Sequence, residues 1–140
     1  MDKYSLETID HELTVLVRRV TSNHKKLGNL DRSAYLLLHQ IIACGPAGVK
    51  VLADEFQLDI STVSRQVAAL EQKGYVFRIP DLLDGRAYTL QITELGTKEF
   101  YENQEMRFTK IAANLTGWTE EERQLFGHFL KKYNQSSLKI

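Results

Sequence analysis

Residues 58–74 read LDISTVSRQVAALEQKG, and this segment predicts one short helix over about residues 60–73 with a signal at each end. Asp59 is placed to cap its N-terminus, because a carboxylate can accept hydrogen bonds from the unpaired N–H groups of the first turn. Gly74 supplies the left-handed residue that commonly closes a helix. Apolar side chains recur at helical spacing and must face a core: Ile60, Val63, Val67 and Leu70.

The opposite face of this helix carries no long acidic side chain. It consists of Ser61, Arg65, Ala68 and Gln72. An ordinary surface helix has long charged side chains there, whereas small hydroxyls, one arginine and alanines let the helix backbone approach another surface closely. We interpret this face as one that enters the major groove of DNA, which admits an α-helix.

Length and composition are those of one ordinary domain. The chain has 140 residues, of which 43% are hydrophobic, and this is enough for one core but not for two independent cores. Lys+Arg and Asp+Glu both number 18, so the molecule as a whole exerts no electrostatic pull on nucleic acid. The interpretation as a DNA-binding protein therefore depends on local pattern.

Cysteine usage and hydropathy predict a soluble, cytoplasmic protein. Cys44 is the single cysteine and cannot form an internal disulfide, and the first residues, Met1–Tyr4, lack the apolar core of a signal peptide. The longest uncharged run, residues 33–49, is interrupted by glycine and proline, so no membrane span is expected. The four histidines show no metal-ligand spacing, and we expect no metal and no cofactor.

Two further helices are predicted before the 60–73 helix. Asp31 starts a helix that is apolar on most sides, and the run Gly45-Pro46-Ala47-Gly48 ends it. Residues 49–56 can form about two helical turns, and the three residues 57–59 join them to the next helix. Two short helices so joined, the second with a small polar face, are typical of the helix-turn-helix motif, although compact all-helical domains contain similar pairs.

A β-hairpin is predicted directly after the 60–73 helix. Residues 75–79 and 87–92 are rich in β-branched and aromatic side chains, and the second run alternates with period two. The segment between them has the proline, acids and glycine of a loop and ends with Arg86. Such a hairpin is a wing, whose tip can lie along the minor groove, where negative potential attracts a guanidinium and where Asp84 can orient Arg86.

Both ends of the chain predict long amphipathic helices. Residues 5–26 carry an apolar seam, and Thr93 caps a helix over about residues 94–114. The residues of the seam are Leu6, Ile9, Leu13, Leu16 and Val20. Thr119 and Glu122 form a capping box for a last helix. The predicted buried stripe of that helix is Leu125, Phe126, Phe129, Leu130 and Tyr133. Together these helices have more apolar surface than one small domain covers, which predicts a symmetric dimer with recognition helices about 34 Å apart.

Three sequence blocks, taken in order, carry a family resemblance. The blocks are Asp59-x-Ser61-Thr62-Val63-Ser64-Arg65, Leu70-Glu71-x-Lys73-Gly74 and Asp84-x-Arg86-x-x-x-Leu90-x-Ile92-Thr93-x-x-Gly96. With these blocks at this spacing, the whole chain resembles the MarR-type transcriptional regulators, which are winged helix-turn-helix dimers. The resemblance covers essentially every predicted segment.

The resemblance implies a mainly α fold with a small β-hairpin, in which a winged helix-turn-helix domain is flanked by N- and C-terminal dimerisation helices. Residues 1–140 form a single domain in this interpretation. Its parts are a core over 31–92, a recognition helix over about 60–73, a wing over about 75–92, and dimerisation helices over 5–27 and 94–135. The resemblance also implies that Arg86 enters the minor groove and that the DNA-binding residues are Ser61, Thr62, Ser64, Arg65, Asp84 and Arg86.

The chain departs from the family pattern at two places. Many members have a second basic residue where Ile79 stands. Peroxide-sensing relatives have a cysteine in the first helix, whereas residues 5–26 contain none. We interpret Cys44, which lies elsewhere, as an inert core residue.

Two groups of residues have more than one interpretation. Three cations are either phosphate neighbours or solvated surface residues: Lys50, Lys73 and Arg78. Four aromatic residues either line an effector cavity or belong to the core: Tyr35, Phe100, Tyr101 and Phe108.

The sequence predicts a sequence-specific DNA-binding transcriptional regulator. We expect a repressor that binds a palindromic operator as a homodimer and that a small-molecule effector can release, so its partners are double-stranded DNA, a second copy of the chain and that effector. The alternative is a winged-helix protein-interaction module without sequence-specific DNA binding, which the neutral charge and Ile79 permit. No nucleophile with a base, phosphate-binding glycine loop or metal cluster in the sequence supports an enzyme.

Overall fold

The computed structural model describes residues 1–22 and 28–136 and is mainly helical with one antiparallel hairpin, as predicted. The elements follow in the order α1 (Lys3–Ser22), α2 (Arg32–Cys44), α3 (Val49–Phe56), α4 (Ile60–Gln72), β1 (Val76–Pro80), β2 (Tyr88–Ile92), α5 (Glu94–Asn114) and α6 (Glu120–Ser136). The end of the first predicted helix, residues 23–26, lies outside the described residues.

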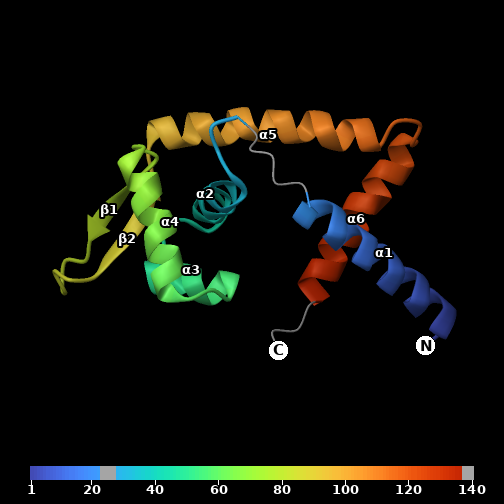
Figure 1. Cartoon of the computed structure of the whole chain (residues 1–140), viewed down its shortest axis with the longest axis horizontal. Helices are drawn as coiled ribbons and strands as arrows, with labels where there is room; N and C mark the ends of the chain where they lie inside the picture. The colour runs from blue at the N-terminus through green and yellow to red at the C-terminus, as the bar shows by residue number, and fades with distance from the viewer. Residues whose placement is uncertain (23–27, 137–140) are drawn as a thin grey trace. The chain divides into compact units, whose positions relative to one another are not determined.

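Contacts between Cα atoms divide the chain into two compact units, Met1–Asn103 and Gln104–Ile140. The first unit holds the short helices α2, α3 and α4 together with the hairpin, which lie beside one another in Figure 1. The second unit holds the end of α5 and all of α6. None of the described helices has both the length and the apolar character needed to cross a membrane.

Side-chain caps fix three of the predicted helix starts. The N–H of Ala34 donates to Asp31 Oδ1 at 2.8 Å, and the N–H of Gly96 donates to Thr93 Oγ1 at 2.9 Å. The capping box is also confirmed, because the N–H of Thr119 donates to Glu122 Oε1 at 2.8 Å and the N–H of Glu122 donates to Thr119 Oγ1 at 3.1 Å. The starts of α2, α5 and α6 are therefore determined by local sequence.

Two predictions for the start of α4 are wrong. Asp59 occupies the N-cap position with an extended backbone, but its side chain makes no capping hydrogen bond. Ile60 and Ser61, at the start of the first turn, are exposed, so water can satisfy their N–H groups instead. Ile60 does not face the core and is 54% exposed, because the packed face of α4 begins only at Val63, which is fully buried.

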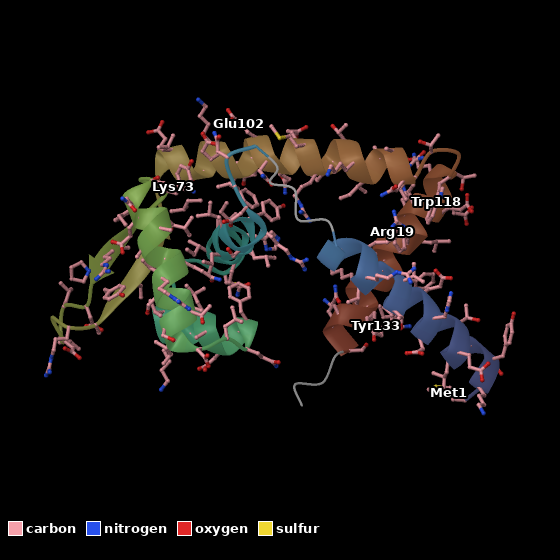
Figure 2. All side chains as sticks on the ribbon, in the orientation of Figure 1. Met1, Arg19, Lys73, Glu102, Trp118 and Tyr133 are labelled. Carbon is pink, nitrogen blue, oxygen red and sulfur yellow. The ribbon has the colours of Figure 1, made fainter. Side chains whose placement is uncertain are left out.

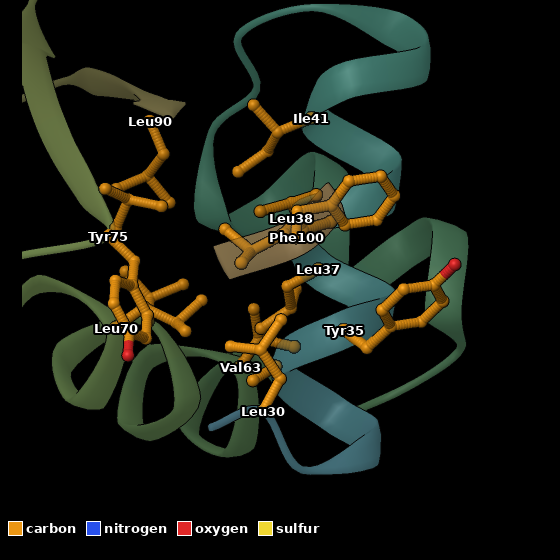
Figure 3. Close-up of a cluster of buried hydrophobic side chains, with 14 of the residues drawn as sticks. Leu30, Tyr35, Leu37, Leu38, Ile41, Val63, Leu70, Tyr75, Leu90 and Phe100 are labelled. Atoms are coloured by element: carbon orange, nitrogen blue, oxygen red, sulfur yellow. The ribbon is translucent and has the colours of Figure 1, made fainter. Parts of the chain in front are cut away.

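One hydrophobic cluster lies among α2, α3, α4, the hairpin and the start of α5 (Figure 3). Leu38 of α2, Val63 of α4 and Leu90 of β2 are completely buried there. Phe100 of α5 is also buried, and its ring stacks on that of Tyr35 with 5.0 Å between centroids. The cluster packs the recognition-helix candidate and the hairpin against the same helix, α2, so their mutual placement depends on one core.

The hairpin is tied to the helices at a second place besides α4. Val76 pairs with Ile92 and Pro80 with Tyr88. Strand β1 begins and ends one residue later than predicted and so includes Pro80 at its end, whereas β2 begins one residue later and ends at Ile92 as predicted. In the turn between α2 and α3, Ala47 forms a bridge with β2: the N–H of Leu90 donates to the Ala47 carbonyl at 2.8 Å, and the N–H of Ala47 donates back at 3.3 Å. The hairpin therefore continues into a short third pairing at Leu90, in the middle of β2.

Tyr75, between α4 and β1, makes the stability of the protein depend on pH in the alkaline range. Burial raises the pKa of its phenol above the ordinary value, with a smaller contribution from the charge of Glu99. A tyrosine of this kind contributes stability that is complete below about pH 10 and is lost as the pH rises through the raised pKa. We expect Tyr75→Phe to remove part of the loss of stability in urea unfolding above pH 10. Tyr4→Phe, at an exposed tyrosine, is the matched control for loss of a phenol hydroxyl.

The terminal helices expose their apolar residues in the single chain. Helix α6 buries no side chain, and its predicted stripe, Leu125, Phe126, Phe129, Leu130 and Tyr133, is 41–56% exposed. In α1, the seam residues Leu6, Ile9, Leu16 and Val20 are 42–49% exposed. The prediction that the α6 stripe is buried is therefore wrong for an isolated chain, since no element of the same unit covers it.

Candidate nucleic-acid interface

A tight three-residue turn joins α3 to α4. Gln57 takes the left-handed conformation, with φ 53°, and the N–H of Leu58 donates to the Ala53 carbonyl at 3.0 Å. This bond satisfies a carbonyl at the end of α3 and redirects the chain within one turn. Ala53 and Val63 are buried where the two helices meet. The arrangement confirms the predicted helix-turn-helix.

The face of α4 that was predicted to bind DNA is open. Ser61, Ser64 and Arg65 are exposed, and Thr62 is half-buried. Ala68, one turn further along, is also exposed, so the middle of this face is low enough for close approach by a flat or grooved partner. Within the residues that the structure describes, the Arg65 guanidinium has no carboxylate partner.

Two aspartates of the wing loop accept hydrogen bonds from backbone N–H groups of the same loop. Asp81 Oδ1 accepts the N–H of Leu83 at 2.8 Å, and Asp84 Oδ1 accepts the backbone N–H of Arg86 at 3.0 Å. Asp84 therefore orients Arg86, as predicted, and does so through the backbone N–H of Arg86. The Arg86 side chain is exposed at the exit of the loop.

The tip of the wing carries a feature that the sequence interpretation missed. Leu82 and Leu83 are 101% and 99% exposed, so neither touches the rest of the unit. The sequence signal that could have identified these exposed leucines is their position between Asp81 and Asp84. Both aspartates form turns in the loop, and a side chain in such a loop does not reach the core.

Arg78, which the sequence left as a phosphate neighbour or a solvated surface residue, forms an ion pair with Glu71. Its Nε donates to both carboxylate oxygens of Glu71 at 3.0 Å, and its Nη2 lies 2.9 Å from Glu71 Oε1. The guanidinium carbon lies 4.3 Å from the centre of the Tyr88 ring. The hydrogen bond that Arg78 donates to Glu71 raises the pKa of Arg78 above its ordinary value. The half-exposed side chain of Arg78 is thus joined by an ion pair to Glu71 of α4, in the same unit.

Lys50 and Lys73 are exposed, and the structure leaves both of their interpretations open. Lys73 stands at the C-terminal end of α4, as Figure 2 shows. A shallow hollow of about 250 Å³ separates α4 from the start of α2. It is lined by Asp31, Ser33, Ala34, Arg65, Gln66, Ala69, Leu70 and Lys73, so it contains one of the predicted site residues.

The remaining sequence candidates take different places. Cys44 is exposed at the end of α2, which corrects its interpretation as a core residue, because the last turn of that helix lies at the surface. Tyr35 and Phe100 belong to the core, whereas Tyr101 is half exposed. Among the described residues, no group of three His, Cys, Asp or Glu side chains is placed to hold a metal ion.

A helix-turn-helix followed at once by a hairpin defines a winged helix-turn-helix protein. Comparison with known proteins gives the family. The MarR family model matches residues 30–88, and the chain is 42% identical over 134 residues to YxaD of Bacillus subtilis (strain 168), an uncharacterized HTH-type transcriptional regulator, with 94% of each chain covered. The chain belongs to the MarR family of transcriptional regulators, as its sequence blocks predicted.

Two solved structures share the fold. One is a MarR family protein from Bacillus stearothermophilus, with a TM-score of 0.82, 20% identity and 96% of both chains covered. The other is FabT of Streptococcus pneumoniae in complex with DNA, with a TM-score of 0.67, 19% identity, and 93% of this chain and 95% of FabT covered. At these identities the likeness concerns the fold alone.

Proposed function

We propose that this protein is a transcriptional repressor that binds a palindromic operator as a homodimer. The observation that carries the proposal is the open face of α4, with an Arg65 that no carboxylate neutralises among the described residues, beside a wing that exposes Arg86. In this proposal Ser61, Thr62, Ser64 and Arg65 contact bases or phosphates in the major groove, Arg86 enters the minor groove, and Asp84 fixes the loop that carries it. The fold shared with FabT, which is solved with DNA, supports it.

Dimerisation and regulation belong to the same proposal. A second copy packed on α1 and α6 would cover their exposed apolar side chains. A small molecule that favours a dimer with mis-spaced recognition helices would then release the operator. We propose the cytoplasm as the place where a repressor of this kind works.

Selection of bound duplexes from a random pool at moderate salt tests the proposal directly. We expect an inverted repeat whose half-sites are centred about one DNA turn, roughly 34 Å, apart. The recovered spacing reports DNA binding, two-fold symmetry and register together. A pool that shows no enrichment over input would contradict the proposal.

Substitution of the two arginines should separate their roles. Arg86→Ala is expected to weaken binding to all duplexes and to lower the salt slope by about 1, because one cationic contact is lost. Arg65→Ala should cost about 1–3 kcal/mol on the selected duplex if Arg65 contacts bases. Titrations by fluorescence anisotropy at several salt concentrations measure both effects. Lys98→Ala, which removes an exposed cation of α5, is the matched control and should change neither quantity.

A second function is favoured by the surface of the wing. Fully exposed Leu82 and Leu83, in a chain with zero net charge, would suit a winged-helix module that binds protein instead of DNA. Partner binding that survives the double substitution Arg65→Ala and Arg86→Ala but is lost with Leu82→Ser and Leu83→Ser would favour this alternative.

A further inference from the structure

We propose that Glu71, Arg78 and Tyr88 form a clamp that sets the angle of the wing to α4, so that Arg78 is a positioning residue and not a phosphate contact. The clamp joins three elements, because Glu71 lies in the last turn of α4, Arg78 in the middle of β1 and Tyr88 at the start of β2. The proposal rests on the proposed function, in which α4 and the wing must reach the same duplex.

The strand register places Arg78 on the side of the hairpin that faces the helices. Arg78 is paired with Leu90, which is completely buried, and residues directly opposite each other in an antiparallel pair project from the same face. Tyr88, two residues before Leu90, shares that face and is a diagonal neighbour of Arg78. A cation directed toward a helix in this way needs a partner, and Glu71 supplies it.

The contacts fix the orientation of the Arg78 guanidinium as well as its distance from the Glu71 carboxylate. Two hydrogen bonds from Nε and a third contact from Nη2 hold the guanidinium edge against the Glu71 carboxylate, with distances of 2.9–3.0 Å. The Tyr88 ring covers the face of the same group at 4.3 Å. A planar cation held at its edge and on its face has little freedom to rotate, which is the property that distinguishes arginine from lysine at such sites.

The clamp attaches β1 to α4 beyond the base of the wing. At the base, the N–H of Tyr75 donates to the Leu70 carbonyl at 2.9 Å, and the N–H of Thr93 donates to the Tyr75 carbonyl at 2.9 Å. Further along, the bridge between Leu90 and Ala47 ties β2 to the turn between α2 and α3. That bridge lies on β2, so it leaves the hairpin able to rotate about that strand. Arg78 lies on the other strand, β1, so its ion pair with Glu71 opposes this rotation.

A small swing would matter for DNA contact. From Val76 to Pro80, β1 extends about 13 Å at roughly 3.3 Å per residue, so a rotation of about 10° at Val76 moves the end of the strand by about 2 Å. The minor groove of B-DNA is only about 6 Å wide. The stability gained from an ion pair whose arginine is half exposed is small, so its main effect is on orientation.

The sign of one substitution distinguishes a clamp from simple electrostatics. Glu71→Gln removes a negative charge beside the interface, and electrostatics alone would make DNA binding tighter. We expect the opposite, a loss of about tenfold in affinity for the selected duplex, because a neutral amide loosens the arginine. Glu102→Gln is the matched control: it breaks an exposed ion pair within one helix, with Lys98 at 3.9 Å, and should leave affinity within about twofold of wild type.

The Arg86→Ala background shows whether the effect passes through the wing. If the clamp acts by placing Arg86, Glu71→Gln and Arg78→Gln should each weaken binding in wild type but have little further effect once Arg86 is removed. The exchanged pair, Glu71→Arg with Arg78→Glu, again places opposite charges at the two positions. It should therefore recover part of the affinity that Glu71→Gln or Arg78→Gln loses. If Arg78 is instead a phosphate contact, Arg78→Gln should weaken binding equally in both backgrounds and Glu71→Gln should not weaken it. That result would overturn the proposal.

A measurement without DNA separates failure of the clamp from failure of the proposed function. Spin labels at Ala68→Cys on α4 and Leu83→Cys on the wing, in a Cys44→Ser background diluted with unlabelled protein, report the distance between α4 and the wing tip within one chain. Glu71→Gln should broaden or shift this distance distribution, and Glu102→Gln should not. An unchanged distribution would refute the clamp even if the protein binds its operator, whereas a changed one in a protein that selects no duplex would refute only the DNA-binding function.

Discussion

Gly96→Ala should destabilise the protein by about 3 kcal/mol, the upper end of the usual cost of overpacking a well-packed site. A Cβ at this position would lie far inside van der Waals contact with the Tyr75 carbonyl oxygen and 2.9 Å from Ile92 Cγ1. The carbonyl cannot turn away without loss, because it accepts the N–H of Thr93 at 2.9 Å. The first turn of α5 would have to move away from the base of the wing.

Urea unfolding at fixed protein concentration measures this effect. Gly85→Ala is the control, because no atom lies within 4 Å of the Cβ that it would add. Its unfolding free energy should stay within about 0.5 kcal/mol of wild type, as for most surface substitutions. Equal stability of the Gly96 and Gly85 variants would mean that α5 and the Tyr75 carbonyl are further apart than the structure indicates.

Gly96 also illustrates how much of the fold the sequence could predict. It closes the third sequence block, and Thr93, three residues earlier, caps α5 as its position indicated. The predicted bounds of α3 and α5 agree with the observed Val49–Phe56 and Glu94–Asn114. These elements are determined by caps, glycines and hydrophobic period, all of which act over a few residues and are readable in one sequence.

The failures concern positions whose environment depends on tertiary packing. Ile60 continues the apolar period of α4 but lies beyond the edge of the core, and Cys44 ends an apolar helix but reaches the surface. A helical period identifies the inner face of a helix and not how far the core extends beneath it. The Asp59 side chain likewise had the right position without making the hydrogen bond.

The candidate site shows the same division. The exposure of Ser61, Arg65 and Arg86 followed from the period of α4 and from the loop composition of the wing. The partner of Arg78 did not, because Glu71 meets it only after the chain has left α4 and entered β1 at a particular angle. A contact across a turn of this kind is a property of the folded unit, and the sequence offered only the charges.

A dimer broken at α6 should show the largest change in DNA binding. Leu125→Asp with Phe129→Asp places two carboxylates on the exposed apolar face of α6, and two-fold symmetry repeats each of them in the partner copy. We expect the variant to sediment as a folded monomer. Its affinity for the palindrome should fall by about 10²–10⁴-fold, because the second half-site no longer binds as part of the same molecule.

Binding to a single half-site separates loss of the dimer from damage to the DNA-binding unit. Both substituted residues lie in Gln104–Ile140, whereas α4 and the wing lie in Met1–Asn103, so the monomer should bind one half-site as weakly as wild type does. Val51→Asp, at an exposed apolar residue of α3, should leave the protein dimeric and shows that a new carboxylate alone does not dissociate it. If the α6 variant stays dimeric and keeps its affinity for the palindrome, α6 is not the interface. The apolar side chains of the terminal helices would then need a different partner.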